Sequence, residues 1–118
     1  MTALRAAGVP VAILLDEGRL TDARTAAAGA VAAKHLAPPV ACVGIVGTGT
    51  QAHLQLTYLE RVTPCREAVV WGRRLEAAEA FADRFQGWRV RPVETIDELC
   101  ARANLVVTTT PSREPLLH

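Results

Sequence analysis

The sequence lacks an excess of charge of either sign. It has 13 lysine and arginine residues against 12 aspartate and glutamate residues, which leaves a formal net charge of +1. Proteins that bind nucleic acid through its phosphates usually carry a clear basic surplus. The charge balance therefore gives no support for a nucleic-acid partner.

A long apolar run is also missing. The N-terminal candidate, residues 9–15, is interrupted by Pro10 and followed directly by Asp16 and Glu17. A bilayer span needs roughly 18 apolar residues, and a secretory signal needs a small-residue cleavage site after its apolar core. We therefore expect neither membrane insertion nor a signal peptide.

Cysteine is scarce and unpaired in its spacing. The three cysteines, Cys42, Cys65 and Cys100, fit neither a disulfide framework nor a metal knuckle. The three histidines show no metal-ligand spacing and no paired carboxylate, and no nucleophile–base arrangement is recognisable. These absences predict no metal site and a reducing compartment, which we take to be the cytoplasm.

The most informative segment that is present covers residues 40–52, VACVGIVGTGTQA. A β-branched run meets the pattern G-x-G-x-x-A, and a helix-compatible stretch follows, which is typical of a dinucleotide-binding turn. Gly47 would make the tight turn, Gly49 would leave room for a pyrophosphate, and Ala52 would keep the helix close to the strand. The N-terminus of that helix would offer unpaired N–H groups and a partial positive charge. A tight turn without a ligand is the alternative interpretation.

Strands and helices alternate regularly from residue 40 onward. Apolar residues recur at helical spacing in residues 75–85, and Thr95 and Glu98 have the pattern of a capping box. We predict strands over residues 41–46, 68–71, 88–93 and 105–109, and helices over 50–62, 75–85 and 96–103. This order predicts an α/β fold with a Rossmann-like parallel sheet and right-handed crossovers. Only the first half of such a fold, with its next strand, fits into the sequence.

Residues 1–39 form a separate segment before this alternation. A strand is predicted over residues 9–15 and an alanine-rich helix over 20–37, which Thr21 would cap and Pro38 would end. Ala26, Ala30 and Ala33 would give that helix a flat face for close packing. We therefore divide the chain into residues 1–39 and a partial NAD(P)-binding domain over residues 40–118.

The end of the second sheet strand bears on the choice of cofactor. NAD-binding sites usually carry Asp or Glu there, bonded to the ribose 2′-OH, whereas this sequence reads Gly72-Arg73-Arg74. Guanidinium groups pair well with phosphate, so we predict a slight preference for NADP(H) over NAD(H). The alternative is that both arginines are solvated surface charges. Residues 108–112, TTTPS, should face the ribose and nicotinamide, although a threonine run ended by a proline turn is the alternative.

Four segments in order resemble the ornithine cyclodeaminase/mu-crystallin family. LTDARTAAAGAVAAKHLA resembles its Arg-Thr-Ala-Ala helix and VGIVGTGTQA its G-x-G-x-Q-A turn, while VVWGRRLEAAEAFA resembles its second strand and helix and ANLVVTTTPSREPLL its T-x-T-P-S segment. The details resemble bacterial members, including those linked to ectoine breakdown. The Arg24–Ala27 helix so close before the first strand disfavours an unrelated Rossmann dehydrogenase.

The resemblance implies an NAD(P)-dependent enzyme that transfers hydride at the α-carbon of a small amino acid or cyclic imine. Cyclodeaminases of the family lose ammonia as the ring closes; imine reductases, alanine dehydrogenases and the non-catalytic NADPH binder mu-crystallin are the alternatives. It implies that residues 1–39 belong to a dimerisation and substrate domain of a homodimer. Gly72 stands where NAD-using members carry Asp. The cofactor-binding residues implied are Arg24, Thr25, Gly47, Gly49, Thr50, Gln51, Ala52, Gly72, Arg73, Thr110 and Ser112.

No catalytic role can be carried over to this chain. The family's substrate-binding Arg and Lys lie upstream of the segment that matches Met1, and its catalytic Asp lies downstream of His118. We therefore expect the 118 residues to be the middle third of such an enzyme, and inactive alone.

Overall fold

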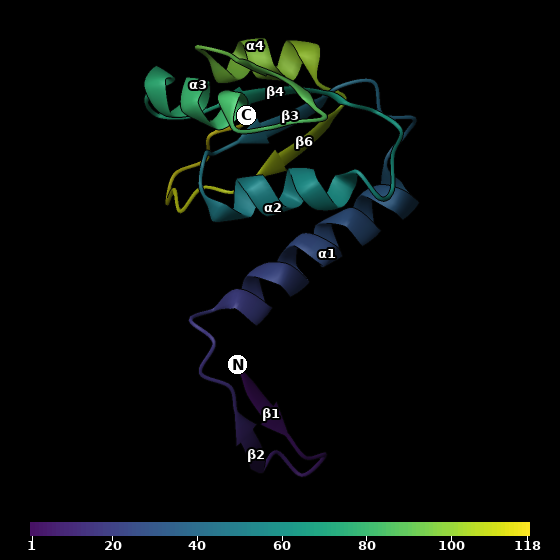
Figure 1. The fold of residues 1–118 in the computed structure, drawn as a ribbon, viewed down its shortest axis with the longest axis vertical. Coiled ribbons are helices and arrows are strands. Elements are labelled where there is room, and N and C mark those ends of the chain that lie inside the picture. The colour runs from purple at the N-terminus through teal and green to yellow at the C-terminus, as the bar shows by residue number, and fades with distance from the viewer.

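A four-stranded parallel sheet forms the centre of the computed structural model, which describes residues 1–118 (Figure 1). Its strands are β3 (Val43–Val46), β4 (Glu67–Trp71), β5 (Arg89–Pro92) and β6 (Leu105–Thr108), in the order β5-β4-β3-β6. Strand β3 pairs with both β4 and β6, so that Val46 lies opposite Trp71 and Thr108. The first strand of the sheet in chain order, β3, lies in its interior; β4 and β5 follow on one side and β6 on the other. This order confirms the predicted Rossmann-like half.

Helices cover both faces of this sheet. Helices α2 (Thr50–Leu59) and α3 (Leu75–Asp83) supply Leu56 and Phe81 to one core cluster, where these side chains join Ile45. Helix α4 (Ile96–Arg102) supplies Leu99 to a second cluster with Val46. Because β3 has helices on both sides, all four of its residues are buried, which explains why its sequence is continuously apolar.

The helical periodicity is confirmed, but α2 and α3 end earlier than predicted. Residues Ala78 and Phe81 are buried, as their spacing indicated. After Leu59, however, the N–H of Val62 bonds the carbonyl three residues back rather than four. Such bonds form a tighter turn that does not continue an α-helix, so the predicted ends at residues 62 and 85 were too late.

The capping box before α4 forms only in part. The Thr95 hydroxyl accepts a hydrogen bond from the Glu98 N–H at 3.1 Å, as predicted. The Glu98 carboxylate instead pairs with Arg102, one turn further along, at 3.1 Å. The second, reciprocal bond of the box is therefore replaced by an ion pair along the helix.

Helix α1 (Arg19–Leu36) packs along α2 through its small residues (Figure 1). Ala26 and Ala30 are buried, which confirms the predicted small-residue face. The predicted cap, Thr21, was wrong: the helix begins at Arg19 after Gly18, and the Asp16 carboxylate accepts the Leu20 N–H at 2.6 Å. Asp16 can do this because Gly18 adopts a left-handed turn (φ 82°) that glycine allows at little cost.

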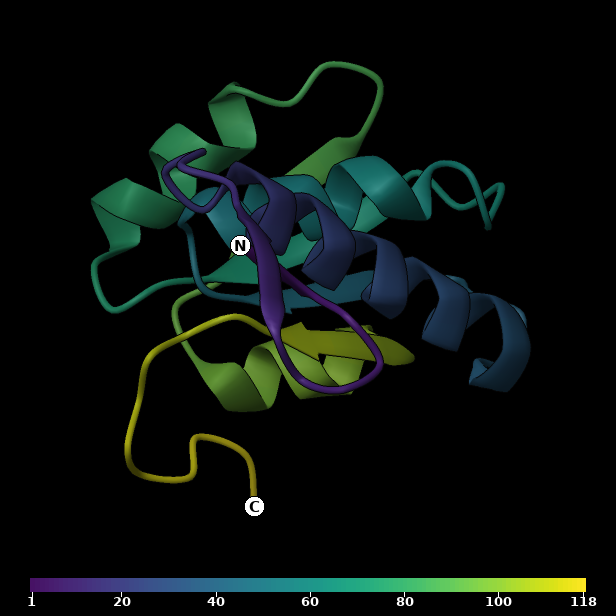
Figure 2. The ribbon, with the colours of Figure 1, turned by 90° about the horizontal axis from the view of Figure 1, so that it is seen from below.

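A two-stranded antiparallel hairpin precedes α1. Its strands, β1 (Thr2–Leu4) and β2 (Pro10–Ile13), are exposed at every residue. The hairpin extends from the sheet domain along the long axis of a molecule that measures 48 × 31 × 30 Å (Figures 1 and 2). The predicted strand over residues 9–15 is shortened to Pro10–Ile13, and β1 was not predicted. None of the helices is both long and apolar enough to span a bilayer.

Candidate functional site

A cleft lies where the carboxyl ends of β3, β4 and β6 meet. Strands that run parallel end at the same edge of a sheet, and in open α/β sheets this edge is where ligands bind. The cleft has a volume of about 320 Å³. Its lining residues come from the loops after these strands and from α3: Gly47, Thr48, Gly49, Gly72, Arg73, Arg74, Ala77, Thr109, Thr110 and Pro111.

Gly47 fixes the turn between β3 and α2. Its N–H donates to the Trp71 carbonyl at 2.8 Å, which ties the turn to the end of β4. Its backbone has φ 122°, a conformation that residues other than glycine rarely adopt, and an added Cβ would collide with the Thr109 hydroxyl. The N–H and hydroxyl of Thr109 both donate to the Val46 carbonyl, at 2.8 and 3.1 Å. The turn is thereby held from both neighbouring strands.

Gly49 and the first turn of α2 provide an open cradle for an anion. No side chain caps this helix, and its first helical bond runs from the His53 N–H to the Gly49 carbonyl at 3.1 Å. The N–H groups of Thr50, Gln51 and Ala52 therefore lack an acceptor within the helix. A Cβ at Gly49 would meet no atom within 4 Å, so the space beside these donors is free. Backbone donors at a helix N-terminus and an open approach fit a phosphate group.

Two unpaired cations stand beside this cradle. Arg73 and Arg74 follow Gly72 after the end of β4, and both are exposed. The ion pairs of the molecule lie elsewhere, between Arg89 and Glu67, between Arg102 and Glu98, and at the N-terminal amine. The cleft therefore carries uncompensated positive charge, which suits an anionic ligand.

The cleft gathers five of the residues predicted from the sequence: Gly47, Gly49, Gly72, Arg73 and Thr110. Thr50, Gln51 and Ala52 form the helical turn that follows Gly49.

Three further predicted residues lie outside the lining. Arg24 and Thr25 belong to α1, where the Thr25 hydroxyl donates to the Thr21 carbonyl at 2.7 Å. Ser112 lies in the loop after β6, and its hydroxyl donates to the Glu114 carbonyl at 2.8 Å.

Two glutamines connect the cleft to α1, and one of them was missed in the sequence. The Gln51 amide donates to the Asp22 carbonyl at 2.9 Å, while its own backbone N–H stays available in the helix turn. The Gln55 amide donates to the Thr25 carbonyl at 3.3 Å and to the Gln51 side-chain oxygen at 3.2 Å. The first half of α1, which carries Arg24, is thereby held at the same edge of the molecule as the cleft. Gln55 sits three residues after Ala52, a helical spacing that could have revealed it.

Thr48 and Arg74 line the cleft but were not among the predicted site residues. The sequence already indicates Arg74 as a second guanidinium beside Arg73, although only Arg73 was assigned to the cofactor. Thr48 occupies a variable position of the glycine motif, and its role in the cleft depends on its contact with Gly72, 24 residues later in the sequence.

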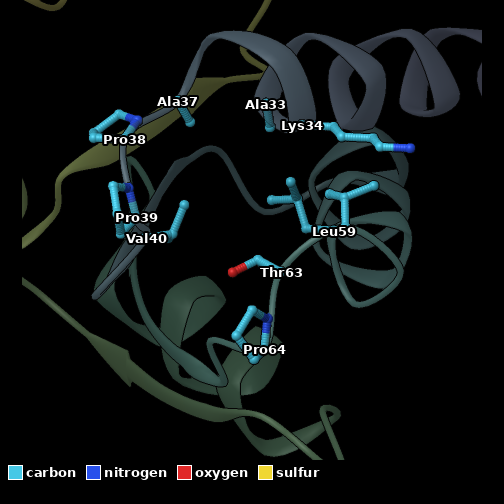
Figure 3. Close-up of a pocket in the computed structure, with 10 residues that line it drawn as sticks. Ala33, Lys34, Ala37, Pro38, Pro39, Val40, Leu59, Thr63 and Pro64 are labelled. Atoms are coloured by element: carbon cyan, nitrogen blue, oxygen red, sulfur yellow. The ribbon is translucent and has the colours of Figure 1, made fainter.

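A second hollow, of about 350 Å³, lies at the other end of α2, and its only polar side chains are those of Lys34 and Thr63 (Figure 3). Its walls come from the end of α1 and the loops around Pro39 and Pro64, so it lies near the amino ends of the strands. The Lys34 side chain runs outward from it (Figure 3). The Thr63 hydroxyl accepts a hydrogen bond from the Cys65 N–H at 3.2 Å. Convergent polar groups are thus found in the first cleft and not in this hollow.

The cysteines are not arranged for chemistry. All three thiols are free, and no three His, Cys, Asp or Glu side chains gather as they would around a metal ion. Burial raises the pKa of the Cys42 thiol, with a smaller contribution from nearby Cys65. A thiol with a raised pKa is less nucleophilic at neutral pH, and Cys42 packs against the core cluster that contains Val46 and Leu99.

Comparison with known proteins gives the family. The sequence profile of the ornithine cyclodeaminase/mu-crystallin family matches residues 4–118. The chain belongs to this family. It is 45% identical over 114 residues to an uncharacterized cyclodeaminase of Sinorhizobium fredii, an alignment that covers 93% of this chain and 34% of that protein.

Solved structures of family relatives share the fold. One is the Δ1-pyrroline-2-carboxylate reductase of Thermococcus litoralis in complex with NADH and L-proline, at a TM-score of 0.81 and 31% identity over 93% of this chain and 35% of that one. Another is an archaeal alanine dehydrogenase dimer with bound NAD, at a TM-score of 0.72 and 36% identity over 85% of this chain and 32% of that one. The chain thus spans about a third of the length of these relatives.

Proposed function

We propose that this chain binds the dinucleotide cofactor of an NAD(P)-dependent enzyme. The observation that carries the proposal is the cleft itself, in which an open approach at Gly49 meets the uncapped N-terminus of α2 and two unpaired arginines. The N–H groups of Thr50, Gln51 and Ala52 would hold the diphosphate. Thr110 and Ser112 would lie along the nicotinamide side, and Arg24 with Thr25 would approach from α1.

For the whole protein we propose hydride transfer at the α-carbon of a small amino acid or cyclic imine, with loss of ammonia as in the cyclodeaminases. The bound cofactor supplies the redox chemistry by accepting or returning a hydride at C4 of its nicotinamide. The residues of this chain bind and orient that cofactor, because the cleft contains no carboxylate, histidine or lysine that could move a proton. The relatives support this class of reaction, since they include a cyclodeaminase, an imine reductase and an alanine dehydrogenase.

We further propose that the cofactor is NADP(H) rather than NAD(H). Gly72 leaves no carboxylate at the end of β4 to bind a ribose 2′-OH, and Arg73 follows it without an ion-pair partner. A carboxylate at this position would repel a 2′-phosphate, whereas a free guanidinium attracts it. The named relatives were solved with NADH or NAD, so this preference would distinguish the present chain from them.

Titration of the 118-residue chain with NADPH and NADH tests both proposals, with the fluorescence of Trp71 as the signal, because Trp71 directly precedes Gly72. We expect NADPH to bind more tightly, and Arg73→Ala to weaken NADPH about tenfold while leaving NADH nearly unchanged. Arg61→Ala is the matched control, because Arg61 is exposed and lies at the other end of α2. Equal affinity for the two cofactors would refute the NADP preference, and binding of neither by the folded chain would refute the cofactor site.

A second candidate function is NADPH binding without catalysis. The observation that favours it is that arginines are the only titratable side chains in the cleft. On either proposal the 118-residue chain should bind cofactor without oxidising L-proline or L-alanine. Detectable NADPH formation with either amino acid would show that a catalytic group lies within these residues.

The N-terminal segment leads us to propose a homodimer. Residues 1–39 carry exposed apolar side chains at Leu4, Val11, Ile13 and Leu15, and exposed apolar patches of this kind are typical of protein interfaces. We assign residues 1–39 to a dimerisation and substrate domain and residues 40–118 to the cofactor domain. The three free thiols are compatible with the reducing cytoplasm, where we place the protein.

A further inference from the structure

We propose that Thr48 is a second determinant of cofactor choice, because its methyl group excludes a side chain at position 72. The inference deepens the proposed function and rests on it. A Cβ built on Gly72 would lie 2.8 Å from the Thr48 methyl carbon and 3.5 Å from the Arg74 carbonyl oxygen. Contacts below 3.0 Å are not found for real Cβ atoms, so Thr48 must move before any side chain can stand at position 72.

The backbone next to this contact is tied to the sheet. Strands β3 and β4 are in register up to Val46 and Trp71, and the Gly47 N–H is bonded to the Trp71 carbonyl at 2.8 Å. Thr48 and Gly72 are each the next residue along from that bond. That bond therefore holds the two residues close to each other where the strands end.

The side chain of Thr48 can relieve the contact only at a cost. Threonine is branched at Cβ, so few rotamers are available to it. Both of its γ atoms would contact a Cβ built on Gly72, the methyl carbon at 2.8 Å and the hydroxyl oxygen at 3.7 Å. Removing the methyl alone, as in Thr48→Ser, would free the space. Replacing the hydroxyl by a second methyl, as in Thr48→Val, would keep the space filled.

The consequence concerns the ribose end of the cofactor. An aspartate at position 72 would present a carboxylate to a ribose 2′-OH and would favour NADH. Gly72 leaves that position empty, Thr48 hinders any larger residue there, and the volume that remains lies beside the guanidinium of Arg73. Preference for a 2′-phosphate is thus encoded by Thr48 and Gly72 as a pair, with Arg73 as the attracting charge.

The first test uses cofactor affinity. Gly72→Asp is combined with Thr48→Ser and, as the matched control, with Thr48→Val, and the dissociation constants for NADH and NADPH are measured. We expect Gly72→Asp with Thr48→Ser to bind NADH about 2- to 10-fold more tightly than Gly72→Asp with Thr48→Val, the range that a strained rotamer costs. Equal NADH affinity in the two double variants would overturn the inference.

The second test needs no cofactor and no added charge. Gly72→Ala is introduced into the unaltered chain, into the Thr48→Ser variant and into the Thr48→Val variant, and the midpoint of thermal unfolding is measured before and after. We expect Gly72→Ala to lower the midpoint of the unaltered chain and of the Thr48→Val variant, but not that of the Thr48→Ser variant. The same loss in all three would show that the methyl group does not restrict position 72. If the unaltered chain folds but binds neither cofactor, the proposed function and the role in specificity both fail, and this second test still reports the contact.

Discussion

Arg66 provides the sharpest test of how the fold is stabilised, because its guanidinium closes the carboxyl end of α2. One of its nitrogens donates to the Thr63 and Cys65 carbonyls at 2.8 and 2.7 Å, and another donates to the Glu60 carbonyl at 3.1 Å. The last turn of α2 itself contains no basic residue. A cation near a helix carboxyl end is stabilising, so Arg66 supplies from outside the helix what its last turn lacks.

The guanidinium also covers Trp88. Its central carbon lies 5.4 Å from the centre of the indole ring, and the indole N–H donates to the Glu60 carboxylate at 2.7 Å. Hydrogen bonds from a charged donor contribute about 1.5–3 kcal/mol each, and partly exposed cation–ring contacts about 0.5–1 kcal/mol. Arg66 is only half-buried, so water would replace part of what is lost. We expect Arg66→Met to lower the free energy of unfolding by about 2–3 kcal/mol.

Urea unfolding followed by far-UV circular dichroism measures this loss, and for a chain of this size it corresponds to a fall of about 10 °C in the thermal midpoint. Arg61→Met is the control, because the Arg61 side chain is exposed and makes no hydrogen bond or ion pair. Arg66→Lys keeps the charge without the planar guanidinium, so its loss in free energy of unfolding should lie between those of Arg66→Met and Arg61→Met. A loss for Arg66→Met within about 0.5 kcal/mol of the Arg61→Met control would refute this account of the helix end.

Two further predictions concern helix N-termini. Thr95→Ala removes the acceptor of the Glu98 N–H and should cost about 1 kcal/mol, read as a lower urea midpoint; an unchanged midpoint would mean that water serves as the cap. At the start of α1, the hydrogen bond from the Leu20 N–H holds the pKa of the Asp16 carboxyl below its ordinary value of 3.8. The bond therefore stabilises the folded form above that value, and its contribution is lost as the pH falls through the lowered pKa. The Leu20 amide resonance should shift over this acid range in the unaltered chain but not in Asp16→Asn, and a shift in both would assign the titration to another group.

The sheet and its helices could be predicted from the sequence because local pattern and tertiary burial agree there. Val43 and Ile45 are apolar, β-branched and buried between two helical layers, and Ala78 and Phe81 recur at the spacing of one buried helix face. Strand β1 could not be predicted in this way. Its residues, Thr2–Leu4, have no alternation and no buried side, and the strand exists through pairing with Pro10–Ile13.

In the candidate site, too, the residues that could be predicted are those that a local sequence pattern determines. Gly47, Gly49 and Arg73 stand at fixed offsets from a strand end, so a linear motif finds them. A linear motif does not single out Thr48 or Gln55, because each acquires its partner from a distant segment: Thr48 meets Gly72 only through the register of β3 with β4, and Gln55 meets Thr25 only because α1 lies along α2. The helix start at Gly18 was missed for a related reason, since the Asp16 carboxylate took the role assigned to Thr21.

The exposed hairpin of β1 and β2 should be much less stable against local opening than the buried sheet. Alternating side chains normally fix strand register by burying one face, and neither face is buried here. The register of the two strands also shifts between Ala3 and Leu4. Separating the two strands would therefore expose little additional apolar surface, whereas separating β3 from β4 would open the core. Amide protons of the hairpin should exchange with solvent through small local openings, whereas those of β3 should exchange only when the whole sheet unfolds.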